Sequence, residues 1–231
     1  MEQDLQRFQA AAGEYDSFLE MIPKYDRIVE LMVEVFDQWH REKSPDRVAE
    51  IGIGTAQLTK VVVDRYEPVQ FYGIDGTASM IDQAKSNLGS VGDDSIQLEQ
   101  VMFEDWSPPR DVDWVYSNLS IHHLVDLEKR DLYERIFGAL NRGGKFLLSD
   151  LVRIPDEQFD LYKNLYWDRL TALGFSENDI QDRWEQHRTH DDPADLRATF
   201  RWLREIGFTG VECVWKDFNR AIIVASKYTR S

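Results

Sequence analysis

The spacing of hydrophobic positions changes several times along the chain and predicts a series of helices and strands. From about residue 4 to residue 42, apolar side chains recur at three- and four-residue steps, which is the pattern of an amphipathic helix. The clearest members of this series are Ile28, Leu31, Met32, Val35, Phe36 and Trp39. Pro23 divides the region into two helical pieces, because proline interrupts a helix.

Beyond residue 44, short apolar runs alternate with helical patterns. The apolar runs lie at about 47–51, 69–74, 96–102, 112–117 and 144–151, and the helical patterns lie at about 55–66, 77–88 and 127–141. Strands and helices that alternate in this way form a parallel sheet through right-handed crossovers. The pattern therefore predicts an α/β protein with a Rossmann-like, doubly wound sheet and helices on both faces.

The last third of the chain departs from this alternation. A long helical and aromatic segment at about 155–190 precedes another helical pattern at about 193–206 and two strand-like runs at about 209–216 and 219–227. The connection between these runs is too short for a helical crossover, so they should be antiparallel neighbours. The prediction is a seven-stranded, mostly parallel sheet with an antiparallel C-terminal strand.

Two domains of unequal size follow from this division. Residues 1–44 are expected to form an N-terminal helical cap, and residues 45–231 an α/β domain that carries the insertion at about 155–190. Both helical additions are expected to act as lids over the carboxyl edge of the sheet.

Charge and cysteine content narrow the classes of partner. The chain has 42 acidic and 27 basic residues, with a net charge of -15 and no dense basic cluster, so we expect no nucleic acid partner. Cys213 is the single cysteine, which excludes an internal disulfide and a cysteine-based structural zinc site. No apolar run approaches the roughly 18 residues of a membrane span, and the start lacks signal-peptide features. We expect a cytoplasmic protein without membrane attachment, for which a homodimer is one compatible state.

Candidate chemistry gathers where the predicted strands end. The first strand runs into Glu50-Ile51-Gly52-Ile53-Gly54, and Asp75 ends the second strand 21 residues after Gly54. Glycines alone often serve only to turn the chain. Here the third strand is also followed by Phe103-Glu104-Asp105-Trp106, and the fourth ends in Ser117-Asn118. Small and hydrogen-bonding residues at four successive strand ends predict an adenosine-containing cofactor at the carboxyl edge.

Over residues 45–227, these motifs resemble those of class I S-adenosylmethionine-dependent methyltransferases. The resemblance implies that Glu50, Gly52 and Gly54 lie at the amino acid part of S-adenosyl-L-methionine, with Asn118 beside its methionine part. Asp75 is implied to accept hydrogen bonds from both ribose hydroxyls, which suits the two oxygens of a carboxylate.

For the adenine, the same resemblance implies a set of residues after the second and third strands. Asp105 would take the amino group, with Trp106 or Phe103 against the ring; the other members of the set are Gly76, Met80 and Glu104. Ala56 stands where the family usually has a third glycine. This substitution weighs slightly against NAD, whose pyrophosphate requires a closer approach of the backbone.

Two narrower resemblances bear on the reaction. Segments 117–124 and 149–152 are similar to small bacterial and archaeal methyltransferases, and the last third is similar to carboxy-S-adenosylmethionine synthase. That enzyme holds the extra carboxylate with an arginine on the helix before its Gly-Phe pair. Here Trp202 occupies the equivalent position, with Arg201 beside it. Carboxyl-cofactor chemistry is therefore kept as an alternative.

Histidines supply candidates for proton transfer. His122 or His123, after the fourth strand, could act as a general base near the methyl group, because histidine titrates near neutrality. The alternative is that the pair caps the turn and only one side chain faces the pocket. His187 and His190 with Asp191 and Asp192 have the composition of a metal site, but such sets are usual in loops and helix starts, so we expect no metal.

Aromatic residues are candidates for covering the cofactor and binding the acceptor. Tyr25 is expected to fold over the cofactor. Tyr15, Tyr166, Trp167, Trp202 and Phe218 are candidates for contacting the substrate. Rings can surround a cationic group, although aromatic stripes on helices are often part of a core.

The sequence thus predicts methyl transfer from S-adenosyl-L-methionine to a nitrogen, oxygen or carbon atom of a small molecule. The alternatives are a carboxy-S-adenosylmethionine-type or tRNA-modification-related enzyme, an NAD-dependent oxidoreductase, and a methyltransferase-like protein that binds cofactor without turnover. Ala56 and the Asp105-Trp106 pair weigh against the oxidoreductase.

Overall fold

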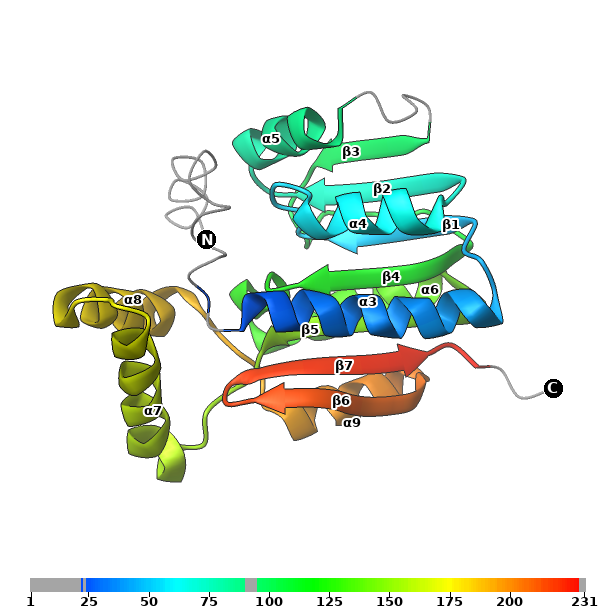
Figure 1. Cartoon of the computed structure of the whole chain (residues 1–231). Helices are drawn as coiled ribbons and strands as arrows, with labels where there is room; N and C mark the ends of the chain where they lie inside the picture. The colour runs from blue at the N-terminus through cyan, green and yellow to red at the C-terminus, as the bar shows by residue number, and fades with distance from the viewer. Residues whose placement is uncertain (1–21, 23, 90–94, 229–231) are drawn as a thin grey trace.

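A computed structural model describes residues 22, 24–89 and 95–228. Its seven strands form one sheet in the order β3-β2-β1-β4-β5-β7-β6 (Figure 1). The strands are β1 (Arg47–Ile51), β2 (Gln70–Asp75), β3 (Ile96–Gln100), β4 (Val112–Asn118), β5 (Leu140–Leu151), β6 (Thr209–Asp217) and β7 (Arg220–Ser226). Neighbours among β1 to β5 are parallel, and β7 is antiparallel to both β5 and β6. The predicted Rossmann-like, seven-stranded sheet with an antiparallel C-terminal strand is confirmed.

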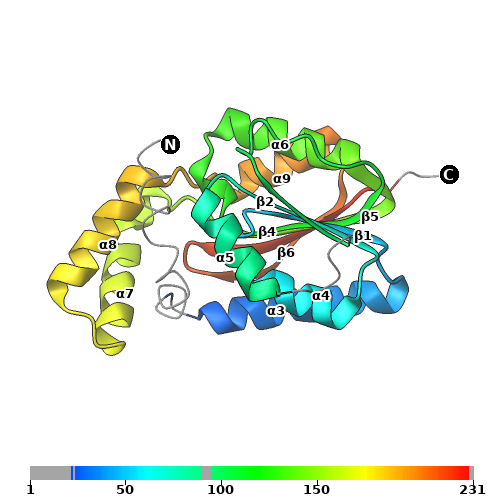
Figure 2. The same ribbon diagram turned by 90° about the horizontal axis from the view of Figure 1, so that it is seen from above.

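Helices cover both faces of this sheet. The described helices are α3 (Tyr25–Glu42), α4 (Gln57–Tyr66), α5 (Ala78–Leu88), α6 (Asp126–Ala139), α7 (Phe159–Ala172), α8 (Glu177–His190) and α9 (Leu196–Ile206), with short 3-10 turns at Ile121–His123 and Asp156–Gln158. Figure 2 shows α3 and α4 on one side of the sheet and α6 and α9 on the other. α7 and α8 project from one end and form the predicted helical insertion.

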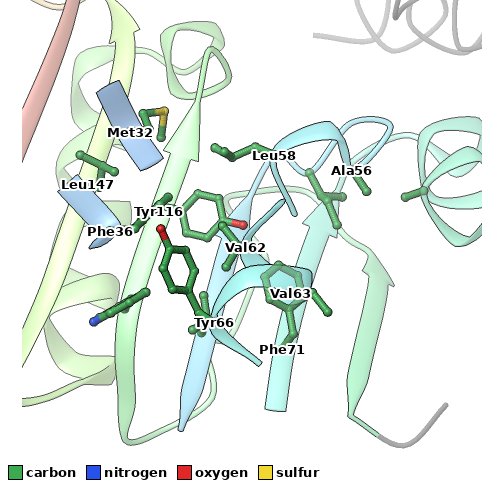
Figure 3. Close-up of a cluster of buried hydrophobic side chains, with 14 of the residues drawn as sticks. Met32, Phe36, Ala56, Leu58, Val62, Val63, Tyr66, Phe71, Tyr116 and Leu147 are labelled. Carbon is green, nitrogen blue, oxygen red and sulfur yellow. The ribbon is translucent and has the colours of Figure 1, made fainter. Parts of the chain in front are cut away.

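One hydrophobic core lies between the sheet and α3, α4 and α5 (Figure 3). Phe36 is fully buried, stacks on Trp114 with ring centroids 5.6 Å apart, and meets Tyr116 edge to face at 5.1 Å. A second core fills the opposite face, where Phe146 and Phe208 pack 5.9 Å apart. The two cores hold the strand ends in fixed register.

α3 covers a face of the sheet, whereas the sequence suggested a lid over its carboxyl edge. Its apolar stripe of Ile28, Met32, Phe36 and Trp39 is buried against the sheet. Only the start of the helix, at Tyr25, reaches the carboxyl edge, where the Tyr25 hydroxyl meets Asn118. Residues 1–21 and 23 of the expected cap, including Tyr15, lie outside the described residues.

β5 begins earlier than the sequence indicated. Asn141-Arg142-Gly143-Gly144 has the composition of a helix C-cap, yet the strand already begins at Leu140, opposite Val112. Gly143 donates its N–H to the Lys227 carbonyl over 2.7 Å, so pairing with a distant segment extends the strand. Among the described helices, none has the length and apolarity required to cross a membrane.

Candidate functional site

A left-handed turn follows β1 at the carboxyl edge of the sheet. Gly52 and Gly54 have φ values of 72° and 52°, and Ala56 follows at 67°. The Ser120 side chain occupies the space that a β-carbon on Gly52 would need, and the Phe103 ring comes within 3.3 Å of that position. Gly52 is therefore required by the turn and by local packing, independently of any ligand.

Asp75 connects this turn to the end of β2. One carboxylate oxygen accepts the N–H of Gly54 at 3.1 Å, and the other accepts the N–H of Thr77 at 2.9 Å. Burial raises the pKa of Asp75, while the two backbone donors act in the opposite direction. Each carboxylate oxygen has a further lone pair, so Asp75 can still accept hydrogen bonds from a ligand.

A hollow lies between the turn and the end of β4. Its lining, which we call the cofactor hollow, consists of Tyr25, Glu50, Gly52, Ile53, Gly54, Thr55, Gln57, Leu58, Asn118 and Leu119. Asn118 donates to the Tyr25 hydroxyl at 3.4 Å. Its amide oxygen is buried and accepts no hydrogen bond from the described residues. This acceptor can receive an N–H from a bound molecule, because a buried polar atom is otherwise left unsatisfied.

Glu50 forms the floor of the cofactor hollow. It is 3% exposed and accepts a hydrogen bond from the Thr59 hydroxyl. Burial raises the pKa of Glu50 to about 8, so the carboxyl group holds a proton at neutral pH. A cationic group in the hollow would favour its ionised form.

The residues implied for adenine binding are not all at one place. Met80 is buried in α5, and the Gly76 carbonyl accepts from Gln100 at 3.4 Å. Trp106 is buried in the second core. Phe103 is the aromatic residue that reaches the Gly52 turn.

The two acidic residues after β3, Glu104 and Asp105, have different environments. Asp105 is exposed, whereas Glu104 has a buried carboxylate oxygen without a hydrogen-bond partner among the described residues. Glu104 lines a separate, acidic hollow together with Glu128, Asp131, Glu134 and Arg135. The structure therefore does not bring Glu104 into the cofactor hollow.

His122 and His123 have different environments. His122 is buried, and its Nδ1 lies 2.5 Å from a carboxylate oxygen of Asp150. Burial lowers its pKa, but the carboxylates of Asp150 and Asp191 outweigh this effect and raise it. Burial, together with His122, lowers the pKa of His123 to about 4, so His123 is neutral at physiological pH.

Asp191 joins these histidines. One of its carboxylate oxygens lies 3.7 Å from His122 Nε2 and 3.5 Å from His123 Nδ1, and the other lies 2.6 Å from His187 Nδ1. His122, His123 and Asp191 each offer one ligand atom, and these three atoms lie within 4.8 Å of one another. This spacing is close enough to hold a cation. The sequence grouped Asp191 with His187, which does contact it, and with His190 and Asp192, but not with His122 and His123.

An aromatic cavity of about 240 Å³ lies where the insertion meets the ends of β5 and β7. Tyr166 and Phe218 line it, together with Tyr162, Phe159 and Trp184. Trp167 packs on Trp184 with ring centroids 5.7 Å apart and is not part of the lining. Trp202 packs against the second core from α9. Of the four described candidates for substrate binding, the structure thus brings together Tyr166 and Phe218.

Sequence reasoning missed the charged residues of this aromatic cavity. Arg169 makes a bidentate contact with Asp217 at 2.8 and 3.0 Å, and its guanidinium lies 3.6 Å from the Phe218 ring centre. Arg220 also lines the cavity and is 8% exposed. The sequence did contain one indication of Arg220, because this arginine is the first residue of an otherwise largely apolar strand.

Comparison with known proteins agrees with the predicted resemblance to methyltransferases. Residues 48–144 match a family model described as a methyltransferase domain. An uncharacterized methyltransferase of Anoxybacillus flavithermus is 30% identical over 149 residues, covering 64% of this chain and 63% of that protein. The chain thus spans just under two thirds of the length of this relative.

Two further similarities extend over nearly the whole chain. Carboxy-S-adenosyl-L-methionine synthase of Nautilia profundicola is 21% identical and covers 95% of this chain and 93% of that protein. The structure of DhpI in complex with SAH is 18% identical, covers 99% of this chain and 97% of that chain, and superimposes with a TM-score of 0.67, which shows a shared fold.

The matched domain and the shared fold support the resemblance of this chain to the class I S-adenosylmethionine-dependent methyltransferases. The cofactor of this class is S-adenosyl-L-methionine.

Proposed function

We propose that the protein transfers the methyl group of S-adenosyl-L-methionine to a nitrogen, oxygen or carbon atom of a small molecule. The observation that carries the proposal is the hydrogen bond between Gly54 and Asp75 beside the unsatisfied amide oxygen of Asn118. Together they present acceptors for hydroxyl and N–H groups along one edge of the sheet. A separate aromatic cavity at the same edge provides space for the acceptor.

The cofactor hollow and the neighbouring ends of β2 and β3 have groups suited to each polar part of this cofactor. We propose that Asp75 binds the ribose hydroxyls, and that Glu50 and Asn118 bind the amino acid part, with the Tyr25 ring as a cover. Gly52 and Gly54 provide the turn. For the adenine we propose Phe103 against the ring, with Gly76, Met80 and Asp105 around it. When bound, the cofactor supplies a methyl group on a positively charged sulfur.

The role of the protein in this reaction is mainly positioning. Because the sulfonium is already electrophilic, alignment of the acceptor atom and exclusion of water account for most of the required catalysis. When the acceptor atom carries a proton, we propose that the neutral imidazole of His123 takes it as the new bond to carbon forms. His122, held by Asp150, has the position of a residue that orients this region.

Several features favour a small acceptor. The cavity is about 240 Å³ and partly enclosed by α7 and α8, and the net charge of -15 disfavours the phosphates of nucleic acids. A cytoplasmic location and the two-part domain division remain predictions of the sequence.

Carboxy-S-adenosylmethionine synthesis is a second candidate, because relatives with that activity match over most of the chain. Against it, Trp202 occupies the position of the arginine in that enzyme and packs against the second core, and the Arg201 side chain is 64% exposed. Mass spectrometry of cofactor recovered from the protein after incubation with metabolite extract separates the two candidates. A carboxylated cofactor would favour the synthase.

The direct experiment is incubation with S-adenosyl-L-methionine labelled in its methyl group and a metabolite extract. We expect label on a small molecule. Label confined to RNA or protein would contradict the proposed acceptor class. Calorimetry with NAD, for which we expect no binding, tests the oxidoreductase alternative.

A further inference from the structure

Arg220 is a buried cation in the wall of the aromatic cavity. It is the first residue of β7, is paired in register with Leu151 of β5, and is 8% exposed. Its Nε is buried and donates no hydrogen bond to the described residues. Within the same described ranges, its guanidinium forms no ion pair. An isolated buried charge is unfavourable, so a position of this kind calls for an anion.

The nearby carboxylates are already engaged. Asp217 accepts both hydrogen bonds from Arg169 and also lies 3.1 Å from the Lys24 ammonium. Asp191, on another side of the cavity, is bound to His187 at 2.6 Å. Asp156 also lines the cavity but is exposed to solvent. None of the three forms an ion pair with Arg220. Asp217 is opposite Arg220 in the β6–β7 register and attracts its charge, but this carboxylate is shared with Arg169 and Lys24.

Aromatic rings form much of the remaining wall. Tyr162 and Phe218 meet edge to face at 5.6 Å, and Tyr166 packs on Trp184 at 5.3 Å. A cavity with largely aromatic walls and one buried guanidinium suits a molecule with an apolar body and an oxyanion, since arginine binds carboxylates and phosphates through two parallel N–H donors.

Strand register relates this cation to the cofactor hollow. Asn118 is opposite Ser149, and Leu151, two residues further along β5, is opposite Arg220. With about 3.3 Å per residue along a strand and about 4.8 Å between strands, the α-carbons of Asn118 and Arg220 lie roughly 12 Å apart. One small molecule can therefore reach from the guanidinium toward the methionine end of the cofactor.

We infer that the methyl acceptor carries a carboxylate or phosphoryl group, and that Arg220 binds this group in the aromatic cavity. The inference rests on the proposed methyl transfer and adds the charge of the acceptor. Arg220 is a residue of substrate specificity, and its substitution should leave the cofactor hollow unchanged.

Calorimetry on protein saturated with S-adenosylhomocysteine tests the anion site. The probes are benzoate and phenyl phosphate, with benzyl alcohol as the neutral match. We expect Arg220→Met to weaken binding of the anionic probes at least tenfold and to leave benzyl alcohol unchanged, whereas Arg220→Lys should retain part of the affinity because it keeps the charge. Equal affinity of wild type and Arg220→Met for both anions would overturn the inference.

A control variant and two further measurements distinguish a loss of anion binding from a structural effect of the substitution. Arg41→Met, on the exposed end of α3, should change none of the affinities. Arg220→Met should bind S-adenosylhomocysteine as wild type does and should have a higher Tm without ligand, because it removes a buried charge that forms no ion pair with the described residues. A lower Tm with weaker S-adenosylhomocysteine binding would assign Arg220 a structural role and contradict the inference.

The natural acceptor is tested with methyl-labelled cofactor and an extract divided on an anion-exchange resin. We expect label in the retained, anionic fraction with wild type and its loss with Arg220→Met. Label only in the unretained fraction would overturn the inference while supporting methyl transfer. Failure of the protein to bind S-adenosylhomocysteine would refute the proposed function itself.

Discussion

The backbone N–H of Gly54 donates to the carboxylate of Asp75 at 3.1 Å, although the two residues are 21 positions apart in the sequence. This hydrogen bond fixes the turn after β1 to the end of β2. Because Asp75 also accepts the N–H of Thr77, its carboxylate is oriented before any ligand binds. Asp75 thus organises the edge of the sheet and provides acceptors for the proposed cofactor.

Replacement of Ala56 by glycine should leave the stability nearly unchanged. Ala56 has a φ of 67°, a left-handed conformation that costs a residue with a β-carbon about 1 kcal/mol. Ala56 is also buried in the hydrophobic core, so the loss of its methyl group and the greater freedom of glycine in the unfolded chain offset the relief of this strain. Urea denaturation should therefore show a free energy of unfolding within about 0.5 kcal/mol of wild type in Ala56→Gly. A clear increase would show that the Ala56 methyl group contributes little packing energy.

Stability should depend on pH through Glu50. Its pKa is about 8 in the folded protein and 4.5 in the unfolded chain, so between these values the folded state keeps a proton that the unfolded state releases. The stabilisation is complete below pH 4.5 and is lost as pH rises toward 8, by at most about 1.4 kcal/mol per pH unit. Glu50→Gln lacks this dependence.

Urea unfolding of wild type and Glu50→Gln at pH 5 and pH 8 measures the effect. The free energy of unfolding of wild type relative to the variant should fall by more than about 1 kcal/mol over this range. Parallel pH profiles would show that Glu50 is ionised in the folded protein.

His123→Gln should reduce turnover and leave cofactor affinity unchanged. General base catalysis contributes about 100-fold or more, so we expect a loss of this order in kcat on the acceptor identified by labelling. Because the pKa of His123 is about 4, kcat should show no inflection from this residue between pH 6 and 8. Unchanged turnover in the variant would make His123 structural.

Removal of metal ions should not affect methyl transfer. The potential ligand atoms of His122, His123 and Asp191 lie close together, but Asp150, the His190 backbone and His187 already bind these three residues. Treatment with EDTA followed by gel filtration should leave kcat unchanged. A loss of activity that Zn²⁺ or Mg²⁺ restores would identify this cluster as a metal site.

Much of the sheet could be predicted from the sequence because its strands are continuous apolar runs between turn residues. The start of β5 could not, because its pairing with Val112 and Lys227 depends on tertiary contacts. α3 was predicted as a helix, but its periodicity does not distinguish a lid from a cover on the sheet face.

The candidate site was predictable to a similar degree. The Gly52-Gly54 turn and Asp75 follow from strand ends that must meet at one edge. Trp106 and Phe103 are three residues apart, and only packing decides which ring reaches the turn. Arg220 carries no periodic signal, and its burial depends on how α7 and α8 pack against the ends of β5 and β7.

We claim that this edge of the sheet binds the methyl donor through Asp75, and calorimetric titration of S-adenosylhomocysteine is the decisive measurement. Wild type should bind, and Asp75→Ala should bind at least tenfold more weakly, since hydrogen bonds to a charged group contribute about 1.5–3 kcal/mol. Asp82→Ala, whose side chain is 77% exposed on α5, should match wild type. No binding by wild type, or equal binding by Asp75→Ala, would contradict the claim.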